Sequence, residues 1–249
     1  MSVAALILAG SRGGADPLAE YAGVADKALI EVGGETMLAR VVAVLRAAGI
    51  ERIAVSVSAP AVAEAAAALG AIPLDSAPGP SASTRAGLDA LGAPLLLTTA
   101  DHALLRPEWV RQFLDGVPPE TDVAALLARR EAIVAAAPET KRTYLRFADG
   151  AWSGCNLFYF ATPRAGAAVD LWQRVEADRK RPWRIVRLLG PGMLLRYLLG
   201  RLTLADAVAR LGRTAGVIAA IVAAEDGRAA IDVDKPGDLD LVRKMVAAG

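Results

Sequence analysis

Short apolar runs alternate with helical segments through the first half of the chain, and this alternation constrains the fold more than any other feature. Five of these runs are predicted strands, at residues 3–9, 53–58, 71–74, 94–100 and 122–128. Strands that are apolar throughout and are separated by helices are typical of a parallel sheet covered on both faces. With right-handed crossovers, the pattern predicts an α/β fold, a Rossmann-like three-layer α/β/α sandwich around a mostly parallel sheet.

The segments outside these strands carry further signals. Thr36 and Gly49 are placed to begin and end a helix, because Thr is a good N-cap and Gly commonly follows the last helical turn. Residues 133–160 indicate short strands and turns. Other helices are predicted at 61–69 and 84–91 and from Pro107 and Pro236, and other strands at 28–32, 143–147, 156–160 and 229–233.

The composition fits one folded domain over residues 1–249. Hydrophobic residues make up 54% of the chain and charged residues 22%, which is enough to bury a large core. The net charge of +1 gives no reason to expect a nucleic-acid partner. The N-terminal apolar run is short and lacks a basic flank, and no uncharged run reaches the roughly 18 residues of a membrane span. We therefore expect neither a signal peptide nor a transmembrane helix.

Cysteine and histidine each occur once. Cys155 cannot form an internal disulfide, so we expect a protein of the reducing cytoplasm. His102 alone excludes a Cys/His zinc cluster.

The first chemical signal is the loop at residues 10–23, after the first predicted strand. Ligands of open α/β sheets bind beyond the carboxyl ends of the strands, where this loop begins. Its glycines let backbone N–H groups point inward as an anion-binding nest, and Arg12 and Lys27 can add positive charge for a triphosphate. The alternative is a flexible turn with two solvated basic side chains, since the loop matches no standard phosphate-binding motif.

The second and third signals are carboxylates at the ends of predicted strands. Asp101 directly follows the strand at 94–100, and Asp232 and Asp234 lie two residues apart on the strand at 229–233, so they share a face. Magnesium prefers hard oxygen ligands of this kind and usually also binds substrate phosphates. As alternatives, Asp101 caps the turn before Pro107 and Asp234 caps the last helix. His102 is expected to have a structural role or to support these residues.

These segments together resemble the GT-A-like nucleotidyltransferase family, in particular the molybdenum-cofactor guanylyltransferases and the small cytidylyltransferases. The opening motif of that family, Leu-Ala-Gly followed by Arg and later by Asp-Lys-Ala, is matched by residues 8–10, Arg12 and residues 26–28. Later motifs are matched at 33–38, 101–108 and 232–239. The resemblance covers about residues 3–128 and 229–245.

The resemblance implies a Mg²⁺-dependent enzyme that transfers a nucleoside monophosphate from a triphosphate to a small phosphorylated acceptor, with release of pyrophosphate. Ser83, in the segment 79–88, is similar to the serine that helps to hold the base in cytidylyltransferases, which favours CTP. The acceptor is expected to be a polyol, glycerol or sugar phosphate. The implied roles are Arg12, Lys27 and Asp101 in catalysis, Leu8, Ala9, Gly10, Ser11, Gly13 and Ser83 in nucleotide binding, Asp101, Asp232 and Asp234 in Mg²⁺ binding, and Lys141, Arg142 and Asn156 in acceptor binding.

Three other functions are alternatives. One is a molybdenum-cofactor guanylyl- or cytidylyltransferase. A second is a glycosyltransferase of the same fold, although the Asp-x-Asp pair of that class is absent after residues 94–100. The third is a non-catalytic nucleotide-binding module, which the combination of Arg12, Lys27 and Asp101 disfavours.

Residues 163–212 form a predicted helical insert that is rich in basic and apolar residues. The pair Gly190-Pro191 is expected to break or kink its helix. Three interpretations apply to the part at 179–202: a helical hairpin packed on the sheet, a homodimer surface, or a peripheral anchor at the inner face of a membrane. The first is favoured.

Overall fold

The computed structural model describes residues 2–10, 16–178 and 190–248. Within these residues the main sheet has eight strands, seven of them in the order β10, β7, β9, β6, β1, β4, β5, while β8 pairs with β9. β1, β4, β5 and β6 are parallel, and β9 runs antiparallel between β6 and β7. The bounds are β1 Ala4–Ala9, β4 Ile53–Val57, β5 Ile72–Asp75, β6 Leu95–Thr99, β7 Val123–Arg129, β8 Leu145–Phe147, β9 Gly150–Phe160 and β10 Ala219–Ala223. The predicted mostly parallel α/β sheet is confirmed.

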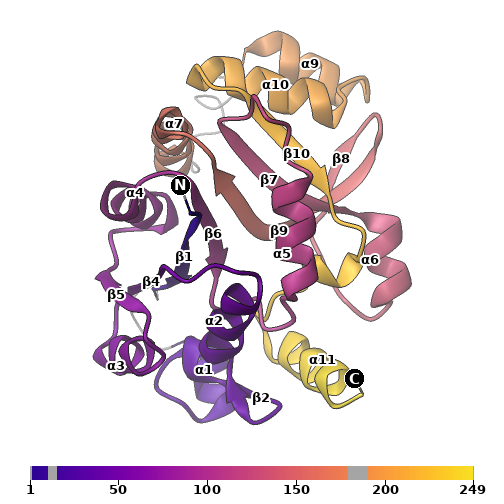
Figure 1. Cartoon of the computed structure of the whole chain (residues 1–249). Helices are drawn as coiled ribbons and strands as arrows, with labels where there is room; N and C mark the ends of the chain where they lie inside the picture. Colours follow the sequence, from indigo (N-terminus) through magenta and orange to yellow (C-terminus); the bar gives the residue numbers. More distant parts are fainter. Residues whose placement is uncertain (1, 11–15, 179–189, 249) are drawn as a thin grey trace.

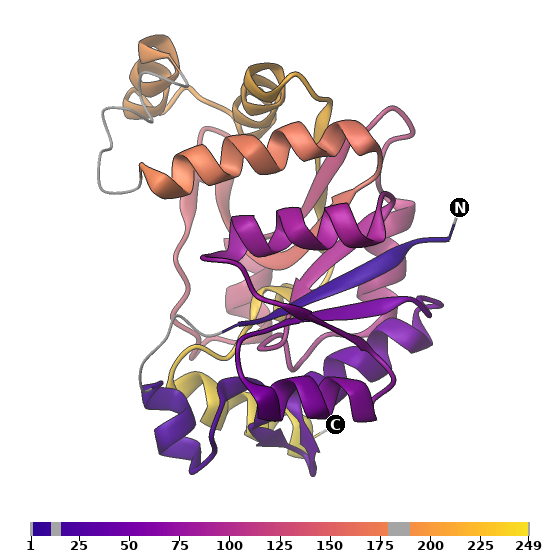
Figure 2. The same cartoon turned by 90° about the vertical axis from the view of Figure 1, so that its left-hand side faces the viewer.

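Helices cover both faces of the sheet (Figures 1 and 2). The side chains of β1 alternate: Ala5 and Ile7 belong to one core, and Ala4 and Leu6 belong to another on the opposite face. The first core includes residues of α2 (Met37–Ala47), α3 (Pro60–Ala68), α5 (Pro107–Asp115) and α6 (Arg130–Ala136), and the second includes residues of α4 (Pro80–Leu91) and α7 (Gly166–Ala177). This arrangement is the predicted three-layer sandwich.

A smaller core joins the two ends of the chain. It contains Leu18 of α1 (Pro17–Ala22), Ile30 and Val32 near β2 (Glu31–Val32, paired with β3, Glu35–Thr36), and Leu239 and Val242 of α11 (Pro236–Ala247). Ile231 and Val233, which precede α11, belong to the same core. In Figures 1 and 2, α11 accordingly lies beside the N-terminal helices. The apolar contacts therefore bring the C-terminal segment next to the loop after β1.

The C-terminal prediction of a strand at 229–233 is wrong. Residues Gly227–Ala230 form the 3-10 helix η3, and the chain then continues extended without joining the sheet. The Val233 N–H donates instead to the carbonyl oxygen of Asp101, at 3.1 Å. The alternating apolar residues Ile231 and Val233 are buried, but in the smaller core rather than on a sheet face.

Several other boundaries also differ from the predictions. The helix expected at 84–91 begins at Pro80, because Pro suits the first position of a helix. The strand expected at 28–32 begins as a 3-10 helix, η1 (Lys27–Leu29), because the Asp26 carboxylate accepts a hydrogen bond from the Ala28 N–H. In the region expected to form short strands and turns, β8 confirms the strand at 143–147, whereas the strand at 156–160 is the end of the longer β9. The helix α6 and the strand β10 were not predicted. The helix begun by Thr36 is confirmed, since Thr36 Oγ1 accepts from the Ala39 N–H at 3.1 Å.

The predicted helical insert contains α7, α9 (Pro191–Leu198) and the first part of α10 (Leu204–Ala215). Gly190 is the N-cap of α9 and Pro191 its first residue, so this pair is a helix boundary as expected. The favoured interpretation of a packed hairpin at 179–202 stays a prediction, because only part of this stretch is described. α9 contains no buried residue, but the Tyr197 ring packs edge-on against Phe147 of β8, with ring centroids 6.1 Å apart. Residues 179–189 lie outside the described part of the chain. No helix among the described residues is long and apolar enough to cross a membrane.

The position of η3 generates a test of the fold. A Cβ atom at Gly227 would lie 2.2 Å from the Ala132 carbonyl oxygen in α6, and backbone cannot move aside as a side chain can. We expect Gly227→Ala to lower the free energy of unfolding by roughly 1–3 kcal/mol, as overpacking does in other cores. Urea denaturation measures this loss.

Gly237→Ala is the matched control, because a Cβ there meets no atom within 4 Å and the residue lies in α11. This control should leave stability unchanged or raise it, since Ala is favoured over Gly in helices. Equal effects at the two positions would contradict the tight contact of η3 with α6.

Candidate active site

The candidate site lies where the order of the strands reverses. From β1 the chain adds β4 and β5 on one side, and β6 pairs with β1 on the other side. Ligands in open α/β sheets bind at the carboxyl ends of the strands at such a point. A cavity of about 90 Å³ lies here, and its lining residues are Leu8, Ala9, Gly10, Asp16, Asp26, Lys27, Ala28, Ala100 and Asp101.

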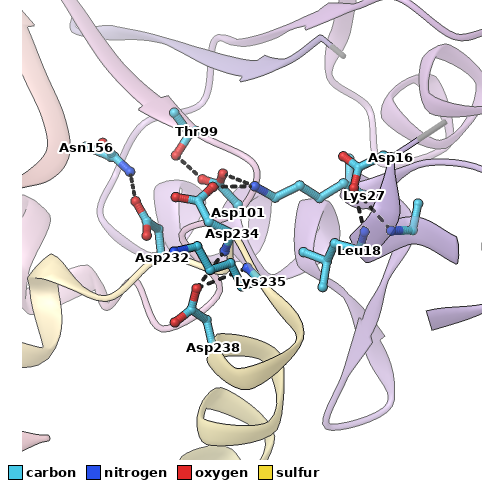
Figure 3. A network of polar contacts seen from close by, with 12 residues as sticks. Asp16, Leu18, Lys27, Thr99, Asp101, Asn156, Asp232, Asp234, Lys235 and Asp238 are labelled. Carbon is cyan, nitrogen blue, oxygen red and sulfur yellow. Dashed lines mark hydrogen bonds and ion pairs between the residues drawn. The ribbon is translucent and has the colours of Figure 1, made fainter. Parts of the chain in front are cut away.

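Lys27 forms an ion pair with two carboxylates from distant parts of the chain. Its Nζ donates to Asp101 Oδ2 at 2.6 Å and to Asp234 Oδ1 at 2.8 Å (Figure 3). The Lys27 and Asp101 side chains are only 22% and 18% exposed, whereas Asp234 is 58% exposed. Burial disfavours the ammonium, but the two carboxylates outweigh this effect and raise the pKa of Lys27 above its ordinary value. The site therefore holds a charged ammonium at neutral pH.

Asp101 is held at the end of β6 by a neighbour on the same strand. The Thr99 hydroxyl donates to Asp101 Oδ1, while Lys27 occupies the other carboxylate oxygen (Figure 3). Arg106, and not Asp101, is the residue directly before α5, the helix that begins at Pro107. The side chain of Asp101 thus faces the cavity and Lys27, and its contacts differ from those expected of a turn cap before Pro107.

Asp232 is held apart from Lys27 by a second group of polar residues. Arg142 binds it with two nitrogens, of which Nη2 lies 3.2 Å from Oδ2, and Asn156 Nδ2 donates to Oδ2 at 2.6 Å. Burial disfavours the Asp232 charge, but Arg142 and Asn156 lower the pKa of Asp232 below its ordinary value. Asn156 has φ of 51°, in the left-handed region that Asn tolerates better than most residues. Strained backbone of this kind is often found at functional sites.

Two of the three predicted Mg²⁺ ligands converge in the structure. Across the described ranges, no group of three or more His, Cys, Asp or Glu side chains is arranged to hold a metal ion. Asp101 and Asp234, however, direct one oxygen each at the same cation, the Lys27 ammonium. Carboxylate oxygens placed in this way fit Mg²⁺. Asp232 binds Arg142 and Asn156 instead, because the segment around it is not the predicted strand.

The other predicted site residues lie at different distances from this cluster. Leu8, Ala9 and Gly10 line the cavity, whereas Ser11, Arg12 and Gly13 lie outside the described residues. Lys141 is exposed beside Arg142. Ser83 Oγ accepts from the Ala77 N–H at 3.0 Å and lies 3.2 Å from the Ala77 carbonyl oxygen. Ser83 thus holds the loop before α4. Ser76 of this loop lies close to Gly10, which lines the cavity: a Cβ atom added at Gly10 would lie 3.1 Å from Ser76 Cβ.

His102 has the properties of a packing residue. It is 1% exposed, and its ring lies 6.4 Å from the ring of Trp109. Burial lowers its pKa to about 4, so the imidazole is neutral at pH 7. This position agrees with the expected structural role.

Three polar residues near the site were not predicted. Thr99 orients Asp101, and Asp16 lines the cavity while its carboxylate accepts from the Leu18 N–H at 2.8 Å. Asp238 accepts from the N–H groups of Asp234 and Lys235, so the predicted capping role of Asp234 is wrong (Figure 3). The pair Asp16-Pro17 is a common helix start that would have indicated α1.

The paired Asp232 generates a prediction about pH and stability. Because its pKa is lower in the folded state, its ion pair stabilises the protein above the unfolded pKa of about 4 and this contribution is lost as the pH falls. We expect Asp232→Asn to reduce the free energy of unfolding by about 3 kcal/mol at pH 7, since it leaves Arg142 half-buried without its charge partner. The difference from wild type should shrink below about pH 4.

Denaturant titrations at several pH values measure this difference. Asp115→Asn is the control, because Asp115 is exposed at the end of α5 and its replacement should have little effect at any pH. A loss for Asp232→Asn that is constant from pH 7 to pH 3 would contradict the assignment.

Comparisons with known proteins agree with this fold. A hypothetical transferase from Thermus thermophilus is 34% identical, with a TM-score of 0.83 over 96% of this chain and 100% of that chain. A CMP:2-keto-3-deoxy-manno-octonic acid synthetase solved with CTP is 18% identical, with a TM-score of 0.61 over 100% and 99% of the two chains. A nucleotidyl transferase from Methanothermobacter thermautotrophicus is 19% identical, with a TM-score of 0.61 over 99% and 98%.

No match was found among curated proteins. The model of the MobA-like NTP transferase domain matches residues 5–152, which is more than half of the chain and includes Lys27 and Asp101. The chain therefore belongs to the MobA-like NTP transferase family.

Proposed function

We propose that this nucleotidyltransferase-family protein transfers CMP from CTP to a small phosphorylated acceptor and releases pyrophosphate. The acceptor class is a polyol, glycerol or sugar phosphate, and the reaction takes place in the cytoplasm. The observation that carries the proposal is the meeting of the Lys27 ammonium with Asp101 on the cavity lined by Leu8 to Gly10. Fixed charge at the carboxyl ends of β1 and β6 suits the transfer of a charged phosphoryl group.

The proposed reaction is an in-line displacement. A phosphate oxygen of the acceptor forms a bond to the α-phosphorus of the triphosphate, and the bond from the α-phosphorus to the bridging oxygen breaks. Pyrophosphate leaves with the electron pair. The attacking oxygen is already ionised, so the step needs no general base, which agrees with the packing role of His102. The contribution of the protein is therefore positioning and charge neutralisation.

Lys27 has the central role in this proposal. Its ammonium is within hydrogen-bond distance of Asp101 and Asp234 before substrate binds. The triphosphate offers Lys27 stronger anionic partners, and Asp101 and Asp234 would then hold Mg²⁺. When bound, the ion supplies neutralising charge to the phosphates. Arg12 and the backbone of Gly10, Ser11 and Gly13 are proposed to bind the remaining phosphate oxygens.

The acceptor is proposed to bind next to Asp232. Arg142 has a buried Nε–H group without a hydrogen-bond partner among the described residues, and buried polar groups are rarely left so. An acceptor phosphate oxygen can accept from this group. Lys141 adds positive charge at the exposed side, and Asn156 keeps Asp232 in place.

The proposal of CTP rests on the segment that contains Ser83, Gly87 and Leu88. It is similar to the base-binding element of cytidylyltransferases, and one structure of similar fold was solved with CTP. Ser83 would act here by fixing the loop at residues 76–79 through Ala77. A molybdenum-cofactor nucleotidyltransferase is the alternative within the family.

A matrix of nucleoside triphosphates and acceptors, read by pyrophosphate release, tests the proposal. We expect turnover with CTP, Mg²⁺ and one of the small phosphorylated acceptors, and a metal requirement that rises in Asp234→Asn. A clear preference for GTP or UTP would reject the base assignment. Turnover with molybdopterin alone would select the alternative acceptor, and no pyrophosphate from any combination would indicate a binding module.

Variants of the ion pair test the site itself. We expect Lys27→Ala and Asp101→Ala each to lower kcat by about 10²-fold or more, because each removes charge that is placed for the transition state. Lys244→Ala is the control, since this exposed lysine lies at the far end of α11 and should leave kcat unchanged. Correctly folded Lys27→Ala with near wild-type kcat would overturn the assignment.

A further inference from the structure

Helix α9 exposes a concentrated apolar surface. The helix contains no buried residue, although the Tyr197 ring packs edge-on against Phe147 of β8. Of the ten large hydrophobic residues that are exposed in the described part of the chain, five lie within residues 194–199. These five form the α9 patch: Leu194 (38% exposed), Leu195 (58%), Tyr197 (42%), Leu198 (70%) and Leu199 (57%). Exposed apolar side chains that gather on one helix in this way are typical of a site of interaction.

A basic groove adjoins the α9 patch. The groove lies between α9 and α10, has a volume of about 420 Å³, and is lined by Arg196, Arg210 and Arg213. Asp206 is the single acidic residue of the lining, and it accepts from Arg196 at 2.5 Å. Three guanidinium groups against one carboxylate give the groove an excess of positive charge, which suits phosphate groups.

The charge of the whole chain is distributed unevenly. Residues 179–213 contain 9 of the 28 Lys and Arg residues but 1 of the 27 Asp and Glu residues. The rest of the chain therefore has 19 basic and 26 acidic residues. The net charge of +1 is therefore the sum of one basic segment and an acidic remainder of the chain. In Figures 1 and 2, α9 and α10 lie together on the outer side of α7, so this surface is at one end of the molecule.

We propose that the α9 patch and the basic groove dock on the surface of an anionic phospholipid bilayer. The leucines would enter the boundary between head groups and acyl chains, and the arginines would bind lipid phosphates. Interfacial anchors combine an apolar face with Lys and Arg in this way. Arg201, which is exposed just after α9, adds attraction to anionic lipid.

Two other occupants fit the surface less well. In a symmetric dimer the same surface meets itself, so the basic segments of two copies would repel each other. Nucleic acid matches the charge, but exposed leucines do not contribute to its recognition as stacking aromatic residues do. An anionic bilayer is complementary to both the charge and the apolar surface.

Flotation of the full-length protein with vesicles tests the proposal. One set of vesicles contains phosphatidylcholine alone, and the other contains phosphatidylcholine mixed with phosphatidylglycerol. We expect flotation with the anionic vesicles only, with binding that weakens as salt is added. The double variant Leu195→Glu/Leu198→Glu should lose binding at least tenfold, and each of Arg210→Gln and Arg213→Gln should weaken it about fivefold.

The control is Ile72→Glu/Val134→Glu, which replaces two other exposed apolar residues, 46% and 41% exposed, on β5 and α6. Its flotation should equal that of wild type. Absence of flotation with anionic vesicles, or equal and salt-insensitive flotation with both kinds, overturns the proposal. Sedimentation equilibrium identifies the competing outcome: a dimer that Leu195→Glu/Leu198→Glu dissociates, without flotation, assigns the surface to contact between copies.

Discussion

The ammonium of Lys27, placed between Asp101 and Asp234, is the interaction on which the candidate site depends. A cation with 22% side-chain exposure is costly to bury without partners, and the Asp101 carboxylate, 18% exposed, needs a positive charge for the same reason. Asp234, which is 58% exposed, is the more solvated of the two partners. Lys27 is the first residue of η1, Asp101 follows β6, and Asp234 belongs to the segment before α11. One ion-pair network thus connects the beginning, the middle and the end of the chain.

Apolar packing brings the residues of this network together. Val233 is fully buried in the small core with Ile30 and Leu239, and its N–H group donates to the Asp101 carbonyl oxygen. These contacts fix Asp234, the next residue, beside Lys27. Asp232, the residue before Val233, is directed to Arg142 and Asn156. An extended segment therefore presents neighbouring carboxylates to two separate groups, which we propose bind a nucleotide phosphate with its metal ion and the acceptor, respectively.

The central strands of the sheet could be predicted from the sequence, because β1, β4 and β6 are buried on both faces and therefore appear as continuous apolar runs. The predicted strands also placed Asp101 and the loop after β1 at the same edge of the sheet, because the carboxyl ends of adjacent parallel strands share one edge. The strand predicted at 229–233 was wrong because Ile231 and Val233 alternate with polar residues, as in a strand, but pack in a separate core. The pairing of Asp232 with Arg142 spans 90 residues, so no local pattern could reveal it.

The central chemical claim is that the nucleoside monophosphate group, with its α-phosphorus, is transferred from a triphosphate to a phosphate oxygen of the acceptor. ³¹P NMR of the reaction mixture follows that atom directly. The account predicts the coupled resonances of a new pyrophosphate linkage in the product and an equal quantity of released inorganic pyrophosphate. Release of orthophosphate from the triphosphate, without a new linkage to the acceptor, would contradict it.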